Sequence, residues 1–255
     1  MEPNQLFNLK GKTALITGAS KGIGEAIARL YASCGANLVI NSRKQEDLDN
    51  VSAEITAAGN ICTGIAANAG NLEDCKMLIE KTMALYGSID ILVNNAAANP
   101  VYGPIVTCEE WAFTKIIDVN LKAPFELCKL VYPIMKQSGA GSVINISSIA
   151  GFTPDPGLGM YSVSKAALNM LTKVMAKEWG TDKIRVNAIC PGLIKTKFSE
   201  ALWQNEKWLA GFIKHLPLGR MGTVEEIAGL ALFLASEASA YCTGTLFTAD
   251  GGITI

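Results

Sequence analysis

The chain has 255 residues, of which 49 % are hydrophobic and 18 % charged, and its formal net charge is −1. This apolar fraction is enough to bury both faces of a β-sheet, and the length fits one large α/β domain or two small ones. The charge is balanced and contains no basic block, so we do not expect a nucleic-acid-binding surface. No apolar run approaches the roughly 18 residues that a membrane span needs, so we expect no membrane insertion.

The two ends and the cysteines bear on the expected compartment. Residues 1–9 lack a basic region followed by an apolar core, so no secretory signal is expected, and residues 251–255 are not a peroxisomal address. The seven cysteines are scattered without a Cys-x-x-Cys pair, and the single histidine is His215. We therefore expect reduced thiols, no metal site, a structural or surface histidine, and a cytoplasmic protein.

The first motif is a strand, a glycine-rich turn and a helix. Thr13–Thr17 is rich in strand-forming residues, and Glu25–Ser33 has a helical pattern. Between them lies Gly18-Ala19-Ser20-Lys21-Gly22-Ile23-Gly24. Glycines let a pyrophosphate approach the backbone, and the dipole of the following helix favours its negative charge. With a strand before it and a helix after it, this turn predicts a dinucleotide phosphate site.

The end of the second predicted strand bears on the choice of cofactor. Residues 37–40 form this strand, and Asn41-Ser42-Arg43-Lys44 follows it. In dinucleotide-binding folds an acidic residue at this point selects NAD through its ribose hydroxyls, and none is present here. Ser42 can hydrogen-bond and Arg43 can bind a 2′-phosphate, with Lys21 nearby in the first turn. We therefore expect NADP(H); the alternative is that Arg43 only begins the next helix in solvent.

Strand and helix patterns alternate along the rest of the chain. The predicted strands are 61–67, 89–93, 142–147, 184–189 and 244–248, and the predicted helices are 45–58, 72–86, 109–120, 121–137, 161–178 and 224–236. Such alternation with short turns predicts right-handed crossovers and a doubly wound parallel sheet with helices on both faces. No internal repeat, low-complexity segment or linker interrupts it, so we expect one domain over residues 1–255.

The candidate reactive groups follow the predicted strand 142–147. Tyr161 and Lys165 are four residues apart, which places them on the same face of one helix. A cation beside a phenol stabilises phenolate and lowers the tyrosine pKa toward working pH. Ser148 follows the strand and would bring a hydroxyl to the carboxyl edge of the sheet. Asn120, where two predicted helices meet, is either a helix cap or a polar group directed at the site.

With these motifs in order, the chain resembles the short-chain dehydrogenase/reductase family over almost its whole length. The resemblance is carried by Thr17-Gly18-Ala19-Ser20-Lys21-Gly22-Ile23-Gly24, Asn94-Asn95-Ala96-Ala97, Asn120, Ser148, Tyr161-x-x-x-Lys165 and Pro191-Gly192. By itself a Tyr-x-x-x-Lys pair is more typical of a surface helix, but the common order of all six motifs makes the resemblance specific. It implies a Rossmann fold with seven parallel strands in the order 3-2-1-4-5-6-7, and a homotetramer.

The resemblance also implies roles for four side chains. Tyr161 would protonate the carbonyl oxygen as hydride arrives, and Lys165 would lower the tyrosine pKa and hold the nicotinamide ribose. Ser148 would hydrogen-bond the substrate oxygen, and Asn120 would anchor a water relay behind Lys165. Further cofactor contacts are implied for Asn68, Asn95, Ala96, Ala97, Pro191, Gly192, Ile194 and Thr196.

Two residues depart from the family pattern. Asn68 stands where an aspartate usually contacts adenine, and its amide can still donate and accept, so we expect adenine binding to survive. Ala97 replaces the glycine that completes Asn-Asn-Ala-Gly, and its β-carbon would slightly narrow the backbone beside the cofactor. Neither change affects the chemical step.

Within the family, residues 41–44 with Lys21 look like the NADPH-dependent ketone reductases, including the carbonyl reductase and tropinone reductase-like groups. We therefore expect reduction of a free small-molecule ketone or aldehyde to an alcohol. Residues 216–222 and 250–252 also resemble the 3-oxoacyl carrier-protein reductases, which is the alternative. An acidic carrier protein needs a basic docking surface, and the matching stretches offer only Lys136 and Lys177, with Glu178 adjacent.

Residues 197–215 are expected to close over the substrate as a lid. Trp203, Trp208 and Phe212 in this segment suggest an apolar or aromatic substrate. Packing between subunits would explain the same aromatic residues equally well. A nucleotide-binding protein without reductase activity would typically lack the tyrosine or the lysine, and this chain has both, which favours an enzyme.

Overall fold

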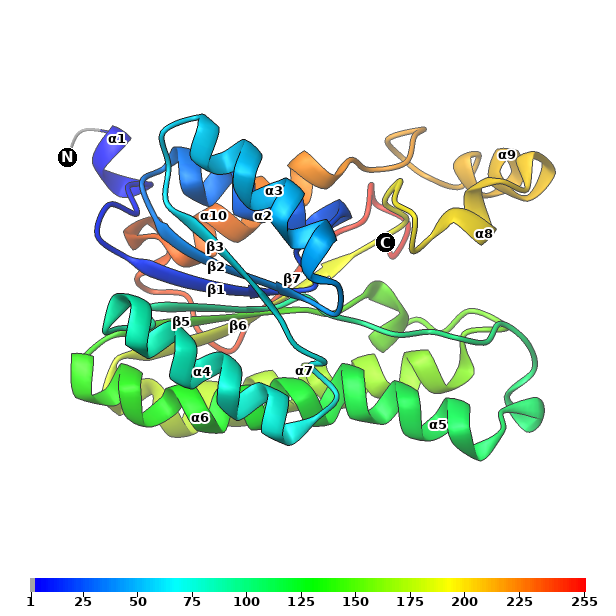
Figure 1. The fold of residues 1–255 in the computed structure, drawn as a ribbon. Coiled ribbons are helices and arrows are strands. Elements are labelled where there is room, and N and C mark those ends of the chain that lie inside the picture. The colour runs from blue at the N-terminus through cyan, green and yellow to red at the C-terminus, as the bar shows by residue number, and fades with distance from the viewer. Residues whose placement is uncertain (1–2) are drawn as a thin grey trace.

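The alternating pattern folds around a single sheet. The computed structural model describes residues 3–255, in which seven strands are paired in parallel (Figure 1). Their order is β3-β2-β1-β4-β5-β6-β7, which confirms the predicted topology. The strands are β1 (Thr13–Thr17), β2 (Asn37–Ser42), β3 (Cys62–Ala66), β4 (Ile91–Asn94), β5 (Gly141–Ile146), β6 (Ile184–Pro191) and β7 (Leu246–Ala249).

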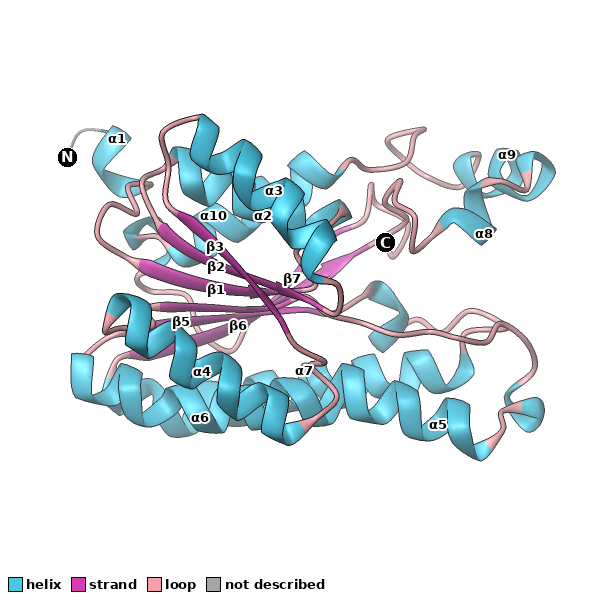
Figure 2. Ribbon diagram, in the orientation of Figure 1, coloured by secondary structure: helices cyan, strands magenta, loops and turns pink. Residues whose placement is uncertain are grey.

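Helices cover both faces of this sheet and give three layers (Figure 2). One face carries α2 (Gly22–Ser33), α3 (Gln45–Ala57) and α10 (Val224–Ala235), and the other carries α4 (Leu72–Tyr86), α6 (Ala123–Ser138) and α7 (Gly159–Trp179). Successive strand residues point to opposite faces, so Ala14 and Ile16 join one core and Leu15 joins the other. Burial on both faces explains why the strands read as nearly continuous apolar runs.

Short elements complete the fold. They are α1 (Pro3–Leu6), α5 (Glu110–Ile117), α8 (Glu200–Trp203) and α9 (Glu206–Ile213), together with 3₁₀ turns that include 105–107 and 149–151. The helices α8 and α9 lie in the expected lid segment and extend beyond the sheet beside the C-terminus (Figure 1).

Several boundaries differ from those that the sequence predicts. Helix α2 begins at Gly22, three residues early, because the glycine-rich turn itself forms the first helical turn. Strand β6 continues two residues further than predicted, so Cys190 and Pro191 pair with β7 in the sheet. The two helices predicted over 109–137 are joined by a π-helical turn at Asp118–Lys122. Helix α4 has the predicted bounds.

Within residues 3–255 no helix is long and apolar enough to cross a membrane. All seven cysteines are free. His215 is exposed just after α9, with its Nδ1 2.9 Å from the carbonyl oxygen of Gly211. It therefore has a local structural contact and lies at the surface.

Candidate active site

The sheet order gathers the predicted site residues at one edge. The strand order reverses between β1 and β4, and ligands of open parallel sheets bind beyond the carboxyl ends of the strands at such a reversal. The predicted residues follow or end these strands: Gly18, Ser20, Lys21, Gly22, Ile23 and Gly24 after β1; Ser42 and Arg43 at the end of β2; Asn68 after β3; Asn95, Ala96 and Ala97 after β4; Ser148 after β5; and Pro191, Gly192, Ile194 and Thr196 from the end of β6. The parallel sheet thus brings residues from six strand ends to one edge.

The glycine-rich turn is fastened to the segment after β4. The side-chain amide of Asn95 donates to the carbonyl oxygens of Thr17 and Gly18, at 3.0 and 2.9 Å. The backbone N–H groups of Asn95 and Ala96 both donate to Thr17 Oγ1 at 3.1 Å. A β-carbon on Gly24 would lie 2.5 Å from Asn95 Nδ2, so only glycine permits this close approach. Asn95 therefore holds the turn in place.

The turn and the loop after β6 face each other. Lys21, at the N-cap of α2, makes no side-chain cap hydrogen bond, so the first-turn N–H groups of this helix can serve an anion. The Thr196 methyl group would lie 3.6 Å from a β-carbon placed on Gly22. The Gly192 N–H donates to the Ala249 carbonyl at 3.0 Å, which fixes the start of this loop. These groups form a cradle at the place where the sequence predicts the pyrophosphate of a dinucleotide.

Two cations lie near the expected adenosine end of the cradle. Lys21 and Arg43 are exposed, and neither takes part in an ion pair found among residues 3–255. The Ser42 hydroxyl donates only a long hydrogen bond, 3.4 Å, to the Lys44 carbonyl. All three side chains are thus available to a phosphate.

Hydrogen bonds within the loop after β3 fix the orientation of the Asn68 side-chain amide. Its Oδ1 accepts a hydrogen bond from the Gly70 N–H at 3.2 Å, and its own N–H donates to Asp74 Oδ2 at 2.7 Å. Because an N–H can only donate, the amide oxygen must face Gly70 and the amide nitrogen must face away. Asn68 therefore offers an outside partner chiefly a hydrogen-bond donor.

Asn120 lies in the π-helical turn and is fully buried. Its Nδ2 donates to the Ala98 carbonyl at 2.9 Å and to Ser164 Oγ at 3.0 Å, and its Oδ1 accepts from the Ala98 N–H at 2.7 Å. It is therefore not a helix cap, which excludes one of the two alternatives left open by the sequence. Asn120 ties the segment after β4 to helix α7, and the π turn supplies the extra residue that directs it inward.

Tyr161 and Lys165 lie in the first turns of α7 and are buried, with 9 % and 2 % of their surfaces exposed. Lys165 Nζ donates to the carbonyl oxygen of Ile146, at the end of β5, at 2.8 Å. The same ammonium lies 5.6 Å from the centre of the Tyr161 ring. The helical spacing thus places the phenol and the ammonium together, as predicted, next to the strand that leads to Ser148.

In the protein without a bound cofactor, the pKa of Tyr161 shifts in the direction opposite to the predicted one. Burial raises the pKa of Tyr161 to about 12, and only the neighbouring Ser148 hydroxyl acts in the opposite direction. Burial also lowers the pKa of Lys165 to about 8. The Lys165 ammonium is hydrogen-bonded to the Ile146 carbonyl and lies over the Tyr161 ring. Tyr161 is therefore a neutral phenol throughout the physiological pH range.

Four further residues at the site were given no role from the sequence, although Thr17 begins the glycine-rich motif and Phe198 lies in the predicted lid segment. Thr17 and Ser164 accept hydrogen bonds from the residues described above, and Ala98 contacts Asn120 through its backbone alone. The Phe198 ring lies 6.0 Å from the Tyr161 ring, centre to centre. Ser164 could have been found, because it lies three residues after Tyr161 on the same helix face. A backbone contact such as that of Ala98 has no side-chain signal.

Comparisons with known proteins agree with this architecture. A family model described as Enoyl-(Acyl carrier protein) reductase matches residues 18–254. The chain is 45 % identical over 244 residues to "Dehydrogenase/reductase SDR family member 4" of Oryctolagus cuniculus, covering 96 % of this chain and 94 % of that protein. A similar relative in Homo sapiens is 43 % identical over 96 % of this chain and 88 % of its own length.

A solved structure shows the same likeness in three dimensions. The gluconate 5-dehydrogenase of Burkholderia cenocepacia J2315, in complex with NADP and tartrate, superposes with a TM-score of 0.95 at 33 % identity and covers 99 % of both chains. The chain is an oxidoreductase and belongs to the short-chain dehydrogenase/reductase family.

Proposed function

We propose that this enzyme reduces a ketone or aldehyde to an alcohol, with NADPH as the hydride source and Tyr161 as the proton donor. The observation that carries the proposal is the position of Tyr161 and Lys165 beside Ser148, at the sheet edge that also holds the glycine-rich turn. One neutral acid, one hydroxyl and one ammonium at a dinucleotide cradle are the groups that carbonyl reduction needs.

NADPH, when bound, supplies the hydride, and the protein supplies the proton and the orientation. The Ser148 hydroxyl donates a hydrogen bond to the carbonyl oxygen and positions it beside Tyr161. The phenol then transfers its proton to that oxygen, which is a stronger base than phenolate once the carbonyl has been reduced. Lys165 would hold the ribose hydroxyls of the cofactor, and Asn120 joins α7 to the segment after β4 through its hydrogen bonds.

The side chains near the end of β2 are the reason for proposing NADPH and not NADH as the cofactor. Arg43 and Lys21 are exposed cations at the strand end where an NAD-dependent enzyme would place a carboxylate. A guanidinium binds a 2′-phosphate with charge-assisted hydrogen bonds that NADH cannot receive. The fold alone does not decide, since one similar structure holds NADP and another, a 7α-hydroxysteroid dehydrogenase, holds NADH.

A free substrate is proposed over one carried on an acyl carrier protein. Of the two lysines that could form a basic docking surface, Lys136 is already 3.2 Å from the carboxylate of Asp182. Lys177 is exposed beside Glu178, so little net positive charge remains for an acidic partner. The resemblance to 3-oxoacyl carrier-protein reductases remains the second candidate, because it rests on residues 216–222 and 250–252.

The single domain, residues 1–255, would close on its substrate through the lid at 197–215 and would assemble as a cytoplasmic homotetramer. Large apolar side chains are exposed on α5 and α7, among them Trp111, Met170 and Val174. Exposed apolar helix faces of this kind are suited to contacts between subunits.

The test is an NADPH-oxidation screen over ketones, diketones, quinones, β-keto esters and a 3-oxoacyl carrier-protein thioester, followed by absorbance. We expect several free carbonyl compounds to be reduced, with NADH used much less efficiently. A large preference for the carrier-protein thioester in kcat/KM would establish the second candidate. No oxidation with any carbonyl compound would overturn the proposal.

A further inference from the structure

The predicted lid, residues 197–215, is hydrogen-bonded through its side chains to one place in the rest of the chain. Within residues 3–255, every side-chain hydrogen bond that joins the lid to residues outside it ends on Ile194 or Thr196. These two residues lie in the loop after β6, which faces the glycine-rich turn. The polar attachment of the lid is therefore part of the proposed cofactor site.

Trp203 makes one of these connections. Its indole Nε1 donates to the Thr196 carbonyl oxygen at 2.9 Å, and the Lys195 ammonium lies 5.6 Å from the centre of its ring. Trp203 is the last residue of α8, which has a single turn and no buried residue of its own. A single helical turn is not stable by itself, because its few hydrogen bonds do not offset the ordering of its backbone. The position of α8 therefore depends on contacts such as that of Trp203.

Ser199, at the N-cap of α8, makes the other connection. Its hydroxyl donates to the Ile194 carbonyl oxygen at 2.6 Å and lies 3.1 Å from Thr196 Oγ1. A hydroxyl has one proton to donate, and the shorter bond to the carbonyl oxygen takes it. The Thr196 hydroxyl is then the donor in the 3.1 Å contact, and it can direct the same proton to a phosphate oxygen. The lid thus holds the loop through two backbone carbonyls and leaves the Thr196 side chain usable for a ligand.

The start of this loop is attached to the fold independently of the lid. The Lys195 N–H donates to the Gly222 carbonyl, and the Gly222 N–H donates to the Leu193 carbonyl, both at 3.1 Å. A β-carbon on Gly222 would lie 2.5 Å from Ile194 Cδ1, so the two segments are in contact. Thr196 is the first residue beyond this attachment. It is therefore the point where the fixed part of the loop passes into the lid.

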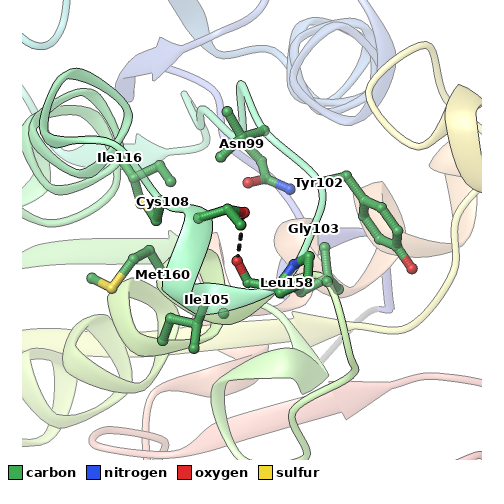
Figure 3. Close-up of a pocket in the computed structure, with 13 residues that line it drawn as sticks. Asn99, Tyr102, Gly103, Ile105, Cys108, Ile116, Leu158 and Met160 are labelled. Atoms are coloured by element: carbon green, nitrogen blue, oxygen red, sulfur yellow. Dashed lines mark hydrogen bonds between the residues drawn. The ribbon is translucent and has the colours of Figure 1, made fainter.

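The lid and the opposite wall of the site differ in what holds them. The cavity of about 200 Å³ beside the start of α7 is lined mainly by the loops at 99–108 and 157–160, and none of the described residues that line it belongs to the lid (Figure 3). On the lid side, the Phe198 ring lies 6.0 Å from the Tyr161 ring, centre to centre. Phe198 directly precedes Ser199 in the chain. The attachment of the lid therefore determines where one ring lies beside the proposed proton donor.

We propose that Trp203 and Ser199 are positioning residues for the cofactor, which hold the loop at Ile194 and Thr196 from the lid, so that cofactor binding and lid closure depend on each other. The inference rests on the proposed function and adds how the lid of that site is controlled. A dinucleotide bound at Thr196 fixes the carbonyl to which the lid is attached, and the coupling is reciprocal, so freeing the lid also weakens cofactor binding. Loss of one neutral hydrogen bond changes such an equilibrium by about 2- to 12-fold.

The test compares Trp203→Phe, which keeps an aromatic ring and removes the indole N–H, with the matched control Trp111→Phe. Trp111 also donates one indole hydrogen bond at 2.9 Å, to Glu109 Oε2, but it lies on α5, outside the lid. The dissociation constant of NADP⁺, measured by calorimetry, should rise by about 2- to 12-fold in Trp203→Phe and stay at the wild-type value in Trp111→Phe. A wild-type dissociation constant in Trp203→Phe would overturn the proposal.

A second measurement separates positioning from a general loosening of the lid. Trypsin cleavage after the exposed Lys207 in α9, followed by mass spectrometry, reports how often the lid opens. Saturating NADP⁺ should slow this cleavage by about tenfold in the wild type and by at most about threefold in Trp203→Phe. If Trp203 only stabilises the lid, cleavage will be faster by the same factor with and without NADP⁺. An unchanged protection ratio of this kind would overturn the coupling.

Ser199→Ala keeps the test decisive if Trp203→Phe fails to unfold cooperatively on heating. It removes the 2.6 Å hydrogen bond to the Ile194 carbonyl and should change both measurements in the same direction. Neither measurement uses a carbonyl substrate, so wild-type values in the folded variants overturn the inference and leave the proposed reduction standing. If NAD⁺ binds and NADP⁺ does not, the choice of NADPH fails and NAD⁺ becomes the probe. Binding of neither nucleotide overturns both the inference and the proposed function.

Discussion

The buried groups of the site and its exposed rim, which is the segment 197–215, make different kinds of contact. Asn120 and Lys165 are almost completely buried, and each hydrogen-bonds to backbone or side-chain atoms of a neighbouring element. Phe198 and Trp208, in the predicted lid segment, are 55 % and 38 % exposed. The Phe198 ring lies 6.0 Å from the Tyr161 ring, and Trp208 is stacked on Phe212 at 5.1 Å. Moving a buried polar group breaks bonds that water cannot replace, whereas a rim side chain can change at little cost.

The difference suggests a division of labour. The buried groups determine which reaction is possible, because their geometry cannot vary without loss of the fold. Under the proposed function, differences in substrate choice are expected to arise in the rim. Variants of the buried groups should therefore act on every substrate alike, and variants of the rim should act on some substrates only.

The largest effect is expected at Tyr161. Tyr161→Phe removes the transferable proton and keeps the ring, so turnover of every carbonyl substrate should fall by about 100- to 10,000-fold. NADPH binding, followed by fluorescence titration, should stay within about twofold of the wild-type value. Unchanged turnover would show that another group donates the proton, and a loss confined to large substrates would break the division between buried groups and rim.

Because Lys165 is buried, its titration should make the free energy of unfolding depend on pH. Its pKa is about 8 when folded and roughly 10.4 when unfolded, so between these values the unfolded chain binds more protons and the stability contributed by this group rises with pH. Below pH 8 the buried ammonium costs about 3 kcal/mol, and this cost disappears as the lysine becomes neutral.

Lys165→Met carries no titrating group at this position. The free energy of unfolding of this variant in urea, minus that of the wild type, should therefore be larger at pH 7 than at pH 10, by about 2–3 kcal/mol. Because other titrating groups are common to both proteins, they cancel in the difference. A difference that does not vary with pH would mean that Lys165 is well solvated or paired.

Arg43 lies at the exposed end of the cofactor site, so its effect should depend on the ligand. Arg43→Ala should raise KM for NADPH by about 10- to 100-fold, since charge-assisted hydrogen bonds to a phosphate contribute roughly 1.5–3 kcal/mol. KM for NADH should hardly change, and the two cofactors measured on one variant provide the control. Equal changes for both would contradict the assignment of Arg43 to the 2′-phosphate.

The sequence was sufficient to predict the sheet order. The apolar residues mark each strand and each helix, and parallel strands can be connected in few ways. It was also sufficient to place Tyr161 next to Lys165, since helical spacing is local. It did not predict the direction of the Tyr161 pKa shift in the protein without cofactor, because burial and the hydrogen bond of the Lys165 ammonium to β5 depend on tertiary packing. It left Asn120 undecided, because the π turn that directs it inward has no clear sequence signal.

The smallest effect is expected on the rim, where two explanations compete for the same aromatic residues. Trp208→Ala should raise KM for aryl ketones by about threefold to tenfold and leave butanedione unaffected if the lid contacts the substrate. Trp111→Ala, at a tryptophan that is 56 % exposed on α5 and is proposed for contacts between subunits, should change neither KM and serves as the control for the KM measurement alone. If Trp208 instead packs between subunits, its replacement should lower the molar mass measured by light scattering while KM stays constant. A change in KM without a change in mass would assign the exposed aromatic residues of the lid to substrate choice, which is the role that the contrast with the buried groups requires.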